Sequence, residues 1–463
     1  MDKQYLEKLL DNMLSTGADF AEIFEENTIS KSYNYIDSKL DNIRFSQTNG
    51  IGLRIAKNTE IYYASINYDD LEDVYNLSND LKNNINDKVL YKNIKLNDLE
   101  KYKADYKISY DDYSDEKIKE YMSKLDKKIR NLDKRVNQVS LTLMQRDDNV
   151  TISNYKGIYK KEQRYNTRFY VSANFKDGEN VASSSFNWGS NGGLEILEKN
   201  IDKELDKLIK FGVDKLYAKP CIGKKMPVIL GPGFGAVIFH EACGHAMEAN
   251  ATANNQSVLA GKIGQKVAND KVTIIDDGTI SNLWGTTKID DEGMPTQKNV
   301  LIKDGVLVNY LNDEINNRKL NMQLTGSSRR EDYHYAPVSR MNNTYLLPRD
   351  DKIEDMIKSI DFGLYAFELG GGSVDTESGD FNFGCETAYM IRNGKIAECV
   401  KGASLIGNAL DILNNVEMVS DNLEYGVGMC GASSGWVYVT IGEPTIKVSS
   451  ILVGGEEDDK WFN

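Results

Sequence analysis

The sequence predicts an α+β protein with a strand-rich N-terminal domain over residues 1–220 and a mainly antiparallel β C-terminal domain over residues 221–463. Three observations support this prediction. The length of 463 residues exceeds what one hydrophobic core usually serves. The first half alternates segments of helical and of strand-like apolar periodicity, so that helices flank its strands. After residue 220 glycine becomes more frequent, and apolar runs are separated by turn-forming pairs.

The N-terminal domain begins with a predicted helix over residues 3–15. Short runs of strand-like residues follow at 21–24, 51–55 and 61–66, and helical spacing returns near 70–84. We therefore expect a block of strands bracketed by two helices. In the first helix the apolar residues recur at the helical period and form one stripe, which consists of Leu6, Leu9, Leu10, Met13 and Leu14.

The same order of elements recurs after a polar connector at about 87–112, which is rich in lysine, aspartate and tyrosine. The repetition suggests an internal duplication, with subdomains at 1–86 and 113–215. The second set of expected elements is a helix near 115–132, strands near 137–147, 149–155, 166–175 and 181–187, and a helix near 194–211.

A domain boundary is expected at about residues 219–223, where a lysine-rich helix ends and an apolar strand at 227–230 begins. Beyond this boundary, residues 300–308 and 389–396 have the pattern of β-hairpins, with Asp-Gly and Asn-Gly at their tips. The C-terminal domain is therefore expected to be mostly antiparallel β, with one helix that matters for function.

Composition and charge exclude several classes of protein. With 56 basic and 70 acidic residues, the chain carries a formal charge of −14, which would repel nucleic acid. No run of about eighteen apolar residues is present, so we expect no membrane span. The first twenty residues are charged and amphipathic, unlike a secretory signal. The five cysteines are odd in number and widely spaced, which favours a reducing cytoplasm over a disulfide framework.

The residues with the most specific chemistry lie in a predicted helix at 233–249, which follows a strand and a Gly-Pro-Gly turn. The helix contains His240-Glu241-Ala242-Cys243-Gly244-His245, and so holds two of the three histidines in the chain. Imidazole is a ligand suited to zinc, which lowers the pKa of a bound water towards about 7. Glu241, directly after the first histidine, could then act as general base and acid. The alternative is a pair of core histidines with Glu241 in a surface salt bridge.

The spacing of the two histidines predicts a distorted helix. They are five residues apart, which separates them by about 140° around an ideal α-helix, whereas a spacing of four places both on one face. A π-bulge, with its i→i+5 hydrogen bonding, would bring them together. Gly244 has low helix propensity and could accommodate such a bulge or a local unwinding.

The third ligand of such a site is left open by the residues alone. The candidates are His334, Cys243, Cys430, Glu248 and several later carboxylates. Cys243 lies three residues after His240 and could share its face, although a free cysteine is more often a small buried hydrophobic residue. Cys430 lies among glycines, which would let the backbone approach a metal closely.

Several ordered motifs extend this pattern through the second half of the chain. They are His-Glu-x-x-x-His at 240–245, Arg-Met-Asn-Asn-Thr-Tyr at 340–345, a glycine-rich segment at 371–381, Gly-Met-Cys-Gly at 428–431 and Gly-Glu-Pro-Thr-Ile-Lys-Val-Ser at 442–449. In this order they resemble the TldD/PmbA family of bacterial and archaeal metallopeptidases, and within it the TldD branch. The N-terminal half resembles the family only in general layout.

The resemblance implies zinc, one Zn²⁺ per active chain, held by His240, His245 and Cys430, with Glu241 as the catalytic glutamate. It also implies hydrolysis of small or unfolded peptides by a dimer, formed with a TldE/PmbA-type subunit or with a second copy. The partner branch lacks the metal motif, so the motif indicates the active type. The alternative is a non-catalytic regulatory or partner-binding subunit of such a complex. A structural zinc site would normally have four protein ligands, whereas three leave an open position.

Two further residues are candidates for substrate binding. His334 could hydrogen-bond the tetrahedral intermediate, or it could be a loop histidine that packs locally. Arg340 could clamp a substrate carboxylate or carbonyl, or it could form a structural salt bridge. A peptide could also lie extended against an edge of the β-rich C-terminal half, a mode of binding that reads few side chains.

Overall fold

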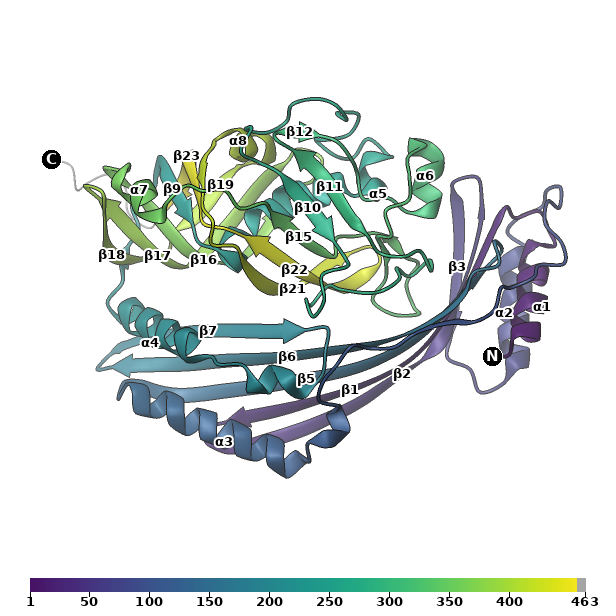
Figure 1. The fold of residues 1–463 in the computed structure, drawn as a ribbon, viewed down its shortest axis with the longest axis horizontal. Coiled ribbons are helices and arrows are strands. Elements are labelled where there is room, and N and C mark those ends of the chain that lie inside the picture. Colours follow the sequence, from purple (N-terminus) through teal and green to yellow (C-terminus); the bar gives the residue numbers. More distant parts are fainter. Residues whose placement is uncertain (456–463) are drawn as a thin grey trace.

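The computed structural model describes residues 1–455 and confirms the α+β class. A long, curved sheet from the N-terminal half lies beneath a β-rich body formed by the C-terminal half (Figure 1). One pair of helices covers one end of the long sheet, and a second pair lies along its other end. The metal-binding candidates belong to the upper body.

The long sheet has seven strands in the order β3-β2-β1-β5-β6-β4, and β7 also pairs with β6. Its strands are much longer than predicted, because their apolar runs cover only the parts that face a helix. The expected strands at 137–147 and 149–155 are one strand of 19 residues. The strands are β1 (Phe20–Ile36), β2 (Lys39–Lys57), β3 (Glu60–Ile66), β4 (Glu100–Tyr102), β5 (Val136–Asn154), β6 (Tyr159–Asp177) and β7 (Asn180–Ser190).

Four helices accompany this sheet, as predicted. The first three agree closely with expectation, and acceptor side chains of Asp2, Asp70 and Ser114 cap their N-termini. The fourth begins later than predicted, because residues 194–198 form a separate 3₁₀ turn. The helices are α1 (Lys3–Leu14), α2 (Leu71–Lys82), α3 (Asp115–Leu132) and α4 (Asp202–Leu216).

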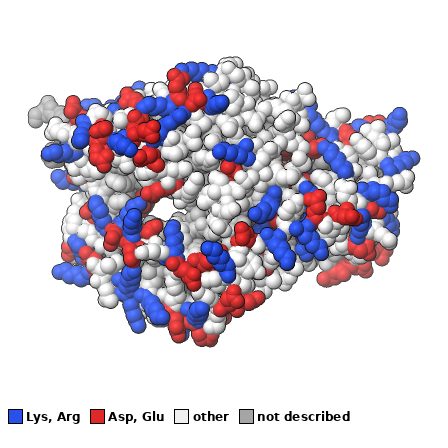
Figure 2. Space-filling view, in the orientation of Figure 1, with Lys and Arg blue, Asp and Glu red and all other residues white. Residues whose placement is uncertain are grey.

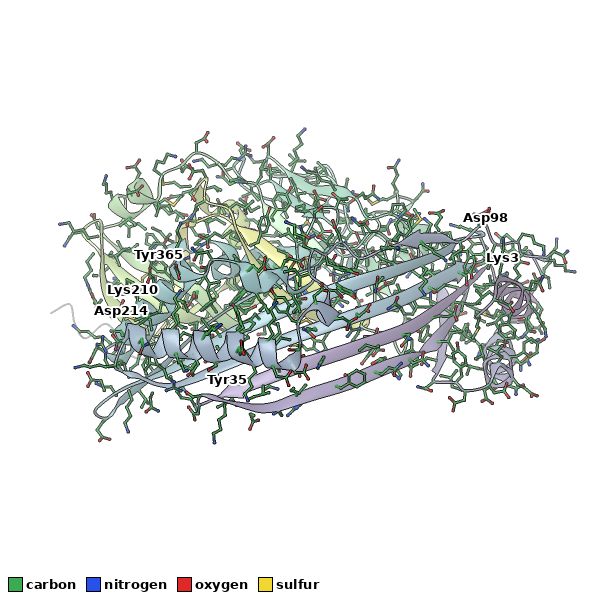
Figure 3. All side chains as sticks on the ribbon, turned by 60° about the horizontal axis from the view of Figure 1, so that its bottom comes forward. Lys3, Tyr35, Asp98, Lys210, Asp214 and Tyr365 are labelled. Atoms are coloured by element: carbon green, nitrogen blue, oxygen red, sulfur yellow. The ribbon has the colours of Figure 1, made fainter. Side chains whose placement is uncertain are left out.

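The order helix, three long strands, helix therefore occurs twice. The two units join edge to edge, because β1 and β5 pair antiparallel from Glu22↔Asn154 to Ile36↔Ser140. The expected subdomains thus share one continuous sheet. Each unit buries its own apolar cluster between helices and strands: Leu9 of α1 packs with Leu53 of β2 in one, and Tyr35 of β1 packs with residues of α3 in the other (Figure 3).

The C-terminal body contains two main sheets that pack around a shared core. The six-stranded sheet has the order β12-β11-β10-β15-β22-β21, and β21 forms its edge. Its strands are β10 (Ile274–Asp277), β11 (Lys298–Lys303), β12 (Val306–Leu307), β15 (Asn343–Leu346), β21 (Glu424–Ala432) and β22 (Gly435–Glu443).

The eight-stranded sheet has the order β16-β9-β23-β19-β17-β18-β8, with β20 paired to β23. Its strands are β8 (Lys219–Pro220), β9 (Lys224–Leu230), β16 (Phe362–Val374), β17 (Asp380–Arg392), β18 (Lys395–Lys401), β19 (Ser404–Asn408), β20 (Val416–Val419) and β23 (Ile446–Gly454). A separate two-stranded sheet joins β13 (Ser328–Arg329) to β14 (Val338–Ser339).

Most strand pairs in this body are antiparallel, as predicted, but β9–β16, β15–β22 and β8–β18 are parallel. Both predicted hairpins are present, since β11 pairs with β12 and β17 with β18. Their tips, at Asp304-Gly305 and Asn393-Gly394, have the expected positive φ angles. The body also contains short helices that the periodicity did not predict: α5 (Ala249–Thr252), α6 (Glu314–Leu320), α7 (Ile353–Lys358) and α8 (Ala409–Asn414).

The two halves are joined by contacts from α4 and from the long sheet. Asp214 of α4 accepts a hydrogen bond of 2.5 Å from the hydroxyl of Tyr389 on β17, and Lys210 lies 3.0 Å from the same hydroxyl (Figure 3). Arg54 of β2 forms a buried ion pair of 2.6 Å with Glu292 of the C-terminal half. Within residues 1–455, none of the helices has the length and apolar content that crossing a bilayer requires.

Candidate metal centre

The segment that carries the histidines is irregular, as their spacing predicts. The turn at Gly233, with a φ of +63°, leads from β9 into a 3₁₀ turn over Gly233–Ala236. Residues His240–Gly244 then form a π-helix, in which the backbone N–H of His245 donates to the carbonyl oxygen of His240. The continuous helix expected over 233–249 is therefore wrong, because the segment consists of short turns of different pitch, whereas the predicted π distortion is confirmed.

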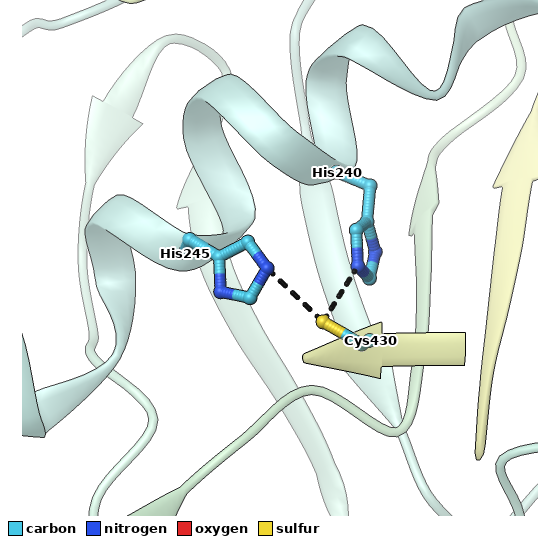
Figure 4. Close-up of side chains that lie close together, drawn as sticks. All are labelled: His240, His245 and Cys430. Atoms are coloured by element: carbon cyan, nitrogen blue, oxygen red, sulfur yellow. Dashed lines mark hydrogen bonds between the residues drawn. The ribbon is translucent and has the colours of Figure 1, made fainter. Parts of the chain in front are cut away.

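The π-helical turn brings both histidines to the same cysteine. The Nε2 atom of His240 lies 3.4 Å from the Sγ atom of Cys430, and the Nε2 atom of His245 lies 3.0 Å from it (Figure 4). The three ligand atoms all lie within 4.8 Å of one another. Two Zn–N bonds and one Zn–S bond in tetrahedral geometry would separate nitrogen from sulfur by roughly 3.5 Å. The donor set and its spacing therefore fit a zinc ion.

Cys430 reaches this position from the edge strand β21. Its partner across the ladder is Val437 of β22, so both side chains face the histidine segment. The glycines around Cys430 allow close packing: a Cβ atom at Gly426 would lie 3.0 Å from the backbone nitrogen of Phe234. A side chain at that position would push the strand away from the turn that precedes the histidines.

Burial and charge favour an ionised thiol at Cys430. The residue is 2% exposed, and burial alone would raise the pKa of its thiol. The adjacent His245 and His240 outweigh this effect and lower the pKa of Cys430 to about 5. Burial lowers the pKa of His245, but Glu248 and Cys430 raise it well above its ordinary value. A thiolate is the form of cysteine that binds a metal.

Glu241 lies beside this group rather than in it. Its Oε2 atom is 3.6 Å from the Nε2 atom of His245, the same nitrogen that faces Cys430. The side chain of Glu241 is 30% exposed, whereas that of His245 is 12% exposed. Its carboxylate can therefore meet both solvent and any group that the three ligand atoms hold.

Two buried charged residues lie behind the ligands. Glu248 accepts a hydrogen bond at 3.0 Å from Nδ1 of His245, which leaves Nε2 free to face Cys430. Arg340 lies 3.5 Å from Glu248, and its Nη2 donates to the carbonyl oxygen of Cys430 at 2.5 Å. Arg340 thus connects the histidine segment to β21.

The remaining candidates do not join the ligand group. Cys243 is completely buried in the apolar core, where burial and Glu443 raise the pKa of its thiol. His334 is on a loop, with its side chain 56% exposed, and it binds Asp332 and stacks against Tyr333. Neither of its contacts involves the ligand group.

Arg340 has no exposed surface, donates to the backbone carbonyls of Gly435 and Cys430, and lies 3.5 Å from Glu248. Glu248 was expected only as a possible ligand. Its spacing of three residues after His245 is a local signal for a side-chain contact. Nothing in the sequence indicates that Arg340 reaches both Glu248 and Cys430.

A cleft with a volume of about 820 Å³ lies between the start of β21 and the start of α4. The hollow between the upper body and the long sheet is visible in Figure 2, with basic and acidic side chains on its rim. Trp284 lines the cleft, and its indole N–H donates at 3.0 Å to the carbonyl oxygen of Gly428, two residues before Cys430.

Comparison with protein-family models gives three matches along the chain. The PmbA/TldA metallopeptidase C-terminal domain matches residues 223–455. Domain 1 of the same metallopeptidases matches residues 21–78, and their central domain matches residues 108–213.

Individual proteins are similar over most of the chain. A metalloprotease TldD homolog of Buchnera aphidicola is 37% identical over 336 residues, which are 70% of this chain and 70% of that protein. A metalloprotease TldD homolog of Haemophilus influenzae is 37% identical over 348 residues, 73% of this chain and 72% of that protein. The crystal structure of TldE from Thermococcus kodakarensis has a TM-score of 0.76 at 21% identity, covers 97% of this chain and 100% of its own, and shows the same fold.

Proposed function

The chain belongs to the PmbA/TldA family of metallopeptidases, and on that premise we propose that it is a zinc-dependent peptidase of the TldD branch. His240, His245 and Cys430 would hold the ion, and Glu241 would be the general base. The observation that carries this proposal is the convergence of three ligand atoms within 4.8 Å beside a partly exposed glutamate.

The chemistry of the donors supports zinc. Two imidazole nitrogens and one thiolate are typical of zinc sites, whereas magnesium and calcium prefer oxygen ligands. Three protein ligands are also the number found in catalytic rather than structural zinc sites. The carboxylate of Glu248 binds the remote nitrogen of His245, so it acts as an outer partner and leaves the fourth position open.

Zinc bound here would polarise the scissile carbonyl and activate a water molecule for attack. Glu241 would accept the proton that the attacking water loses, and would then deliver it to the leaving amine nitrogen. Glu248 would keep the proton of His245 on Nδ1, and Arg340 would fix the position of Glu248 relative to β21. Arg340 is therefore a positioning residue in this proposal and does not contact substrate.

The edge of β21 is the proposed binding surface for an extended peptide. Among the described residues β21 pairs only with β22, so its outer backbone groups are open to another strand. A peptide paired there would pass next to Cys430. Main-chain pairing would place few demands on side chains, which suits small or unfolded peptides as the substrate class.

The working form is proposed to be a dimer in the cytoplasm, with a TldE/PmbA-type subunit or with a second copy. The support for a related partner is that TldE of Thermococcus kodakarensis has the same fold. The five cysteines are all free thiols, which suits a reducing compartment. The alternative function, a non-catalytic subunit, is disfavoured because the complete His-Glu-x-x-x-His motif is present.

The test combines zinc analysis with hydrolysis of an unfolded peptide by wild type and three variants. Glu241→Gln should keep its zinc and lose at least about a hundredfold in turnover, because the general base is absent. Cys430→Ser should lose both zinc and activity. Cys243→Ser is the matched control and should keep both. Retention of zinc by Cys430→Ser, or full activity of Glu241→Gln, would show the assignment to be wrong.

A further inference from the structure

Part of the face of the long sheet that looks towards the C-terminal body is polar, unlike the face that packs against α3. A row of cross-strand neighbours shows this: Arg44 of β2 lies opposite Ser32 of β1, which lies opposite Met144 of β5, and Met144 lies opposite Arg168 of β6. The next row contains Ser46, Ser30, Arg146 and Asn166. Serines and arginines therefore dominate this part of the sheet.

A cavity of about 500 Å³ lies over these rows. Its lining contains three basic residues, of which Arg44 and Arg146 project to this face, and no acidic one, although acidic residues outnumber basic ones by 70 to 56 in the whole chain. This imbalance makes the cavity a place of positive potential on an acidic protein. The lining residues are Ser30, Lys31, Ser32, Arg44, Phe45, Ser46, Met144, Gln145, Arg146, Asn166, Trp284 and Tyr438.

The positive charge of the cavity is only partly neutralised. Lys31 and its cross-strand neighbour Gln145 alternate with Ser30 and Arg146 along their strands, so their side chains project to the α3 face, where Lys31 pairs with Asp115 at 2.6 Å. On the cavity face Arg146 pairs with Asp148 at 2.5 Å and lies 3.5 Å from Glu26. Arg44 makes no ion pair with any of the described residues. The cavity thus presents one unpaired cation.

The cavity lies close to the proposed path of the peptide. Its wall includes Tyr438, which lies opposite Met429 across the β21–β22 ladder, and Met429 is the residue before Cys430. Trp284 also lines both this cavity and the cleft beside β21. In a peptide paired with β21, successive side chains would point alternately to the two faces of the sheet. One set would therefore point towards this cavity.

We propose that the cavity is a subsite for a carboxylate of the peptide substrate, held by Arg44 with help from the serine hydroxyls. The proposal rests on the proposed peptidase function and adds a substrate class to it. The carboxylate could belong to an acidic side chain or to the C-terminus of a short peptide, because the same donors would recognise both.

The test measures kcat/KM of the zinc-loaded, full-length protein for four versions of one peptide. The versions carry glutamate or glutamine near the cleaved bond, and a free or an amidated C-terminus. Wild type should prefer one type of carboxylate-bearing peptide over its neutral counterpart by about tenfold, the worth of one charge-assisted contact. The glutamate pair and the C-terminal pair identify which source of carboxylate the cavity takes.

Arg44→Gln should abolish this preference. Ser46→Glu, which adds a negative charge to the cavity, should reverse the preference. The matched control is Lys39→Gln on the same strand, because Lys39 does not line the cavity. Equal cleavage of all four peptides by wild type, or a preference that survives in both cavity variants, would overturn the proposal. Failure of every peptide to be cleaved would instead contradict the peptidase function itself.

Discussion

Arg340 donates a hydrogen bond to the carbonyl oxygen of Cys430 and lies 3.5 Å from Glu248, which binds His245. The guanidinium therefore fixes the distance between two ligands that are 185 residues apart. We expect Arg340→Lys to weaken zinc binding by about 10- to 100-fold, because an ammonium cannot make these divergent contacts at once. Zinc affinity is measured by competition with a chromogenic chelator, independently of activity.

Arg329 provides the matched control for this prediction. It is also a buried arginine, and its Nη1 donates to the carbonyl oxygens of Met341 and Tyr438 at 2.7 Å. It contacts none of the three ligands or Glu248. Arg329→Lys should therefore destabilise the fold without a matching loss of zinc affinity. If both variants lose the same zinc affinity, Arg340 is a structural residue only.

Among the elements, the π-helical turn depends on the absence of a side chain at Gly244. A Cβ atom there would lie 2.1 Å from Sδ of Met341, the residue after Arg340. We expect Gly244→Ala to lower the free energy of unfolding by about 1–3 kcal/mol through overpacking, and to weaken zinc binding as His245 is displaced. Chemical denaturation and zinc titration of the purified variant measure the two effects.

A double-mutant cycle with Met341→Ala shows whether this contact is the cause. The single change Met341→Ala should cost about 2–5 kcal/mol, because it leaves a cavity in the core. In the double variant the new methyl group would occupy part of that space. The double variant should therefore lose less unfolding free energy than the sum of the losses in the two single variants. Strict additivity would place the effect of Gly244→Ala in the backbone of the turn instead.

At the scale of the whole molecule, buried ion pairs hold the long sheet against the C-terminal body. Arg54 binds Glu22 within the sheet and Glu292 across the interface, both at 2.6 Å. Arg330 of the C-terminal half binds Glu22 at 2.5 Å. Removal of one partner would leave an uncompensated buried charge. The site is therefore held over a sheet whose position depends on paired charges.

Glu26 lies at this interface, where its carboxylate accepts a hydrogen bond from the backbone N–H of Tyr333 at 2.8 Å. Burial and the neighbouring Asp148 raise the pKa of Glu26 from 4.5 to about 7. Between these two pKa values Glu26 is protonated in the folded protein and ionised in the unfolded chain. The contribution of Glu26 to the free energy of unfolding therefore rises as the pH falls from 8 to 5. Between pH 8 and pH 5 the free energy of unfolding of wild type should rise by about 2 kcal/mol relative to that of Glu26→Gln.

Urea unfolding of wild type and Glu26→Gln at both pH values measures this gain, and the difference between the proteins removes contributions from other groups. Glu116→Gln, which changes an exposed carboxyl on α3 and retains Glu26, is the control and should show the same gain as wild type. A wild-type advantage that is the same at pH 8 and pH 5 would contradict a raised pKa for Glu26.

The sequence by itself determined the features that depend on neighbours along the chain. The helical stripe at Leu6 to Leu14, the hairpin tips at Asp304-Gly305 and Asn393-Gly394, and the distortion between His240 and His245 all follow from local periodicity and backbone preference. It did not determine the lengths of the strands. Parts of β1 and β2 lack a run of apolar residues, because one face of these strands borders the cavity instead of a core.

Only the tertiary structure decided which residues meet. From local spacing Cys243 and Cys430 were both candidate ligands, but Cys243 points into the apolar core and Cys430 points at the histidines. For Arg340 the sequence left open a substrate clamp or a structural salt bridge, and in the structure its buried side chain lies 3.5 Å from Glu248 and donates to the carbonyl oxygen of Cys430. Such contacts join segments that are far apart in the chain. They are set by strand pairing and core packing, which no local pattern of residues encodes.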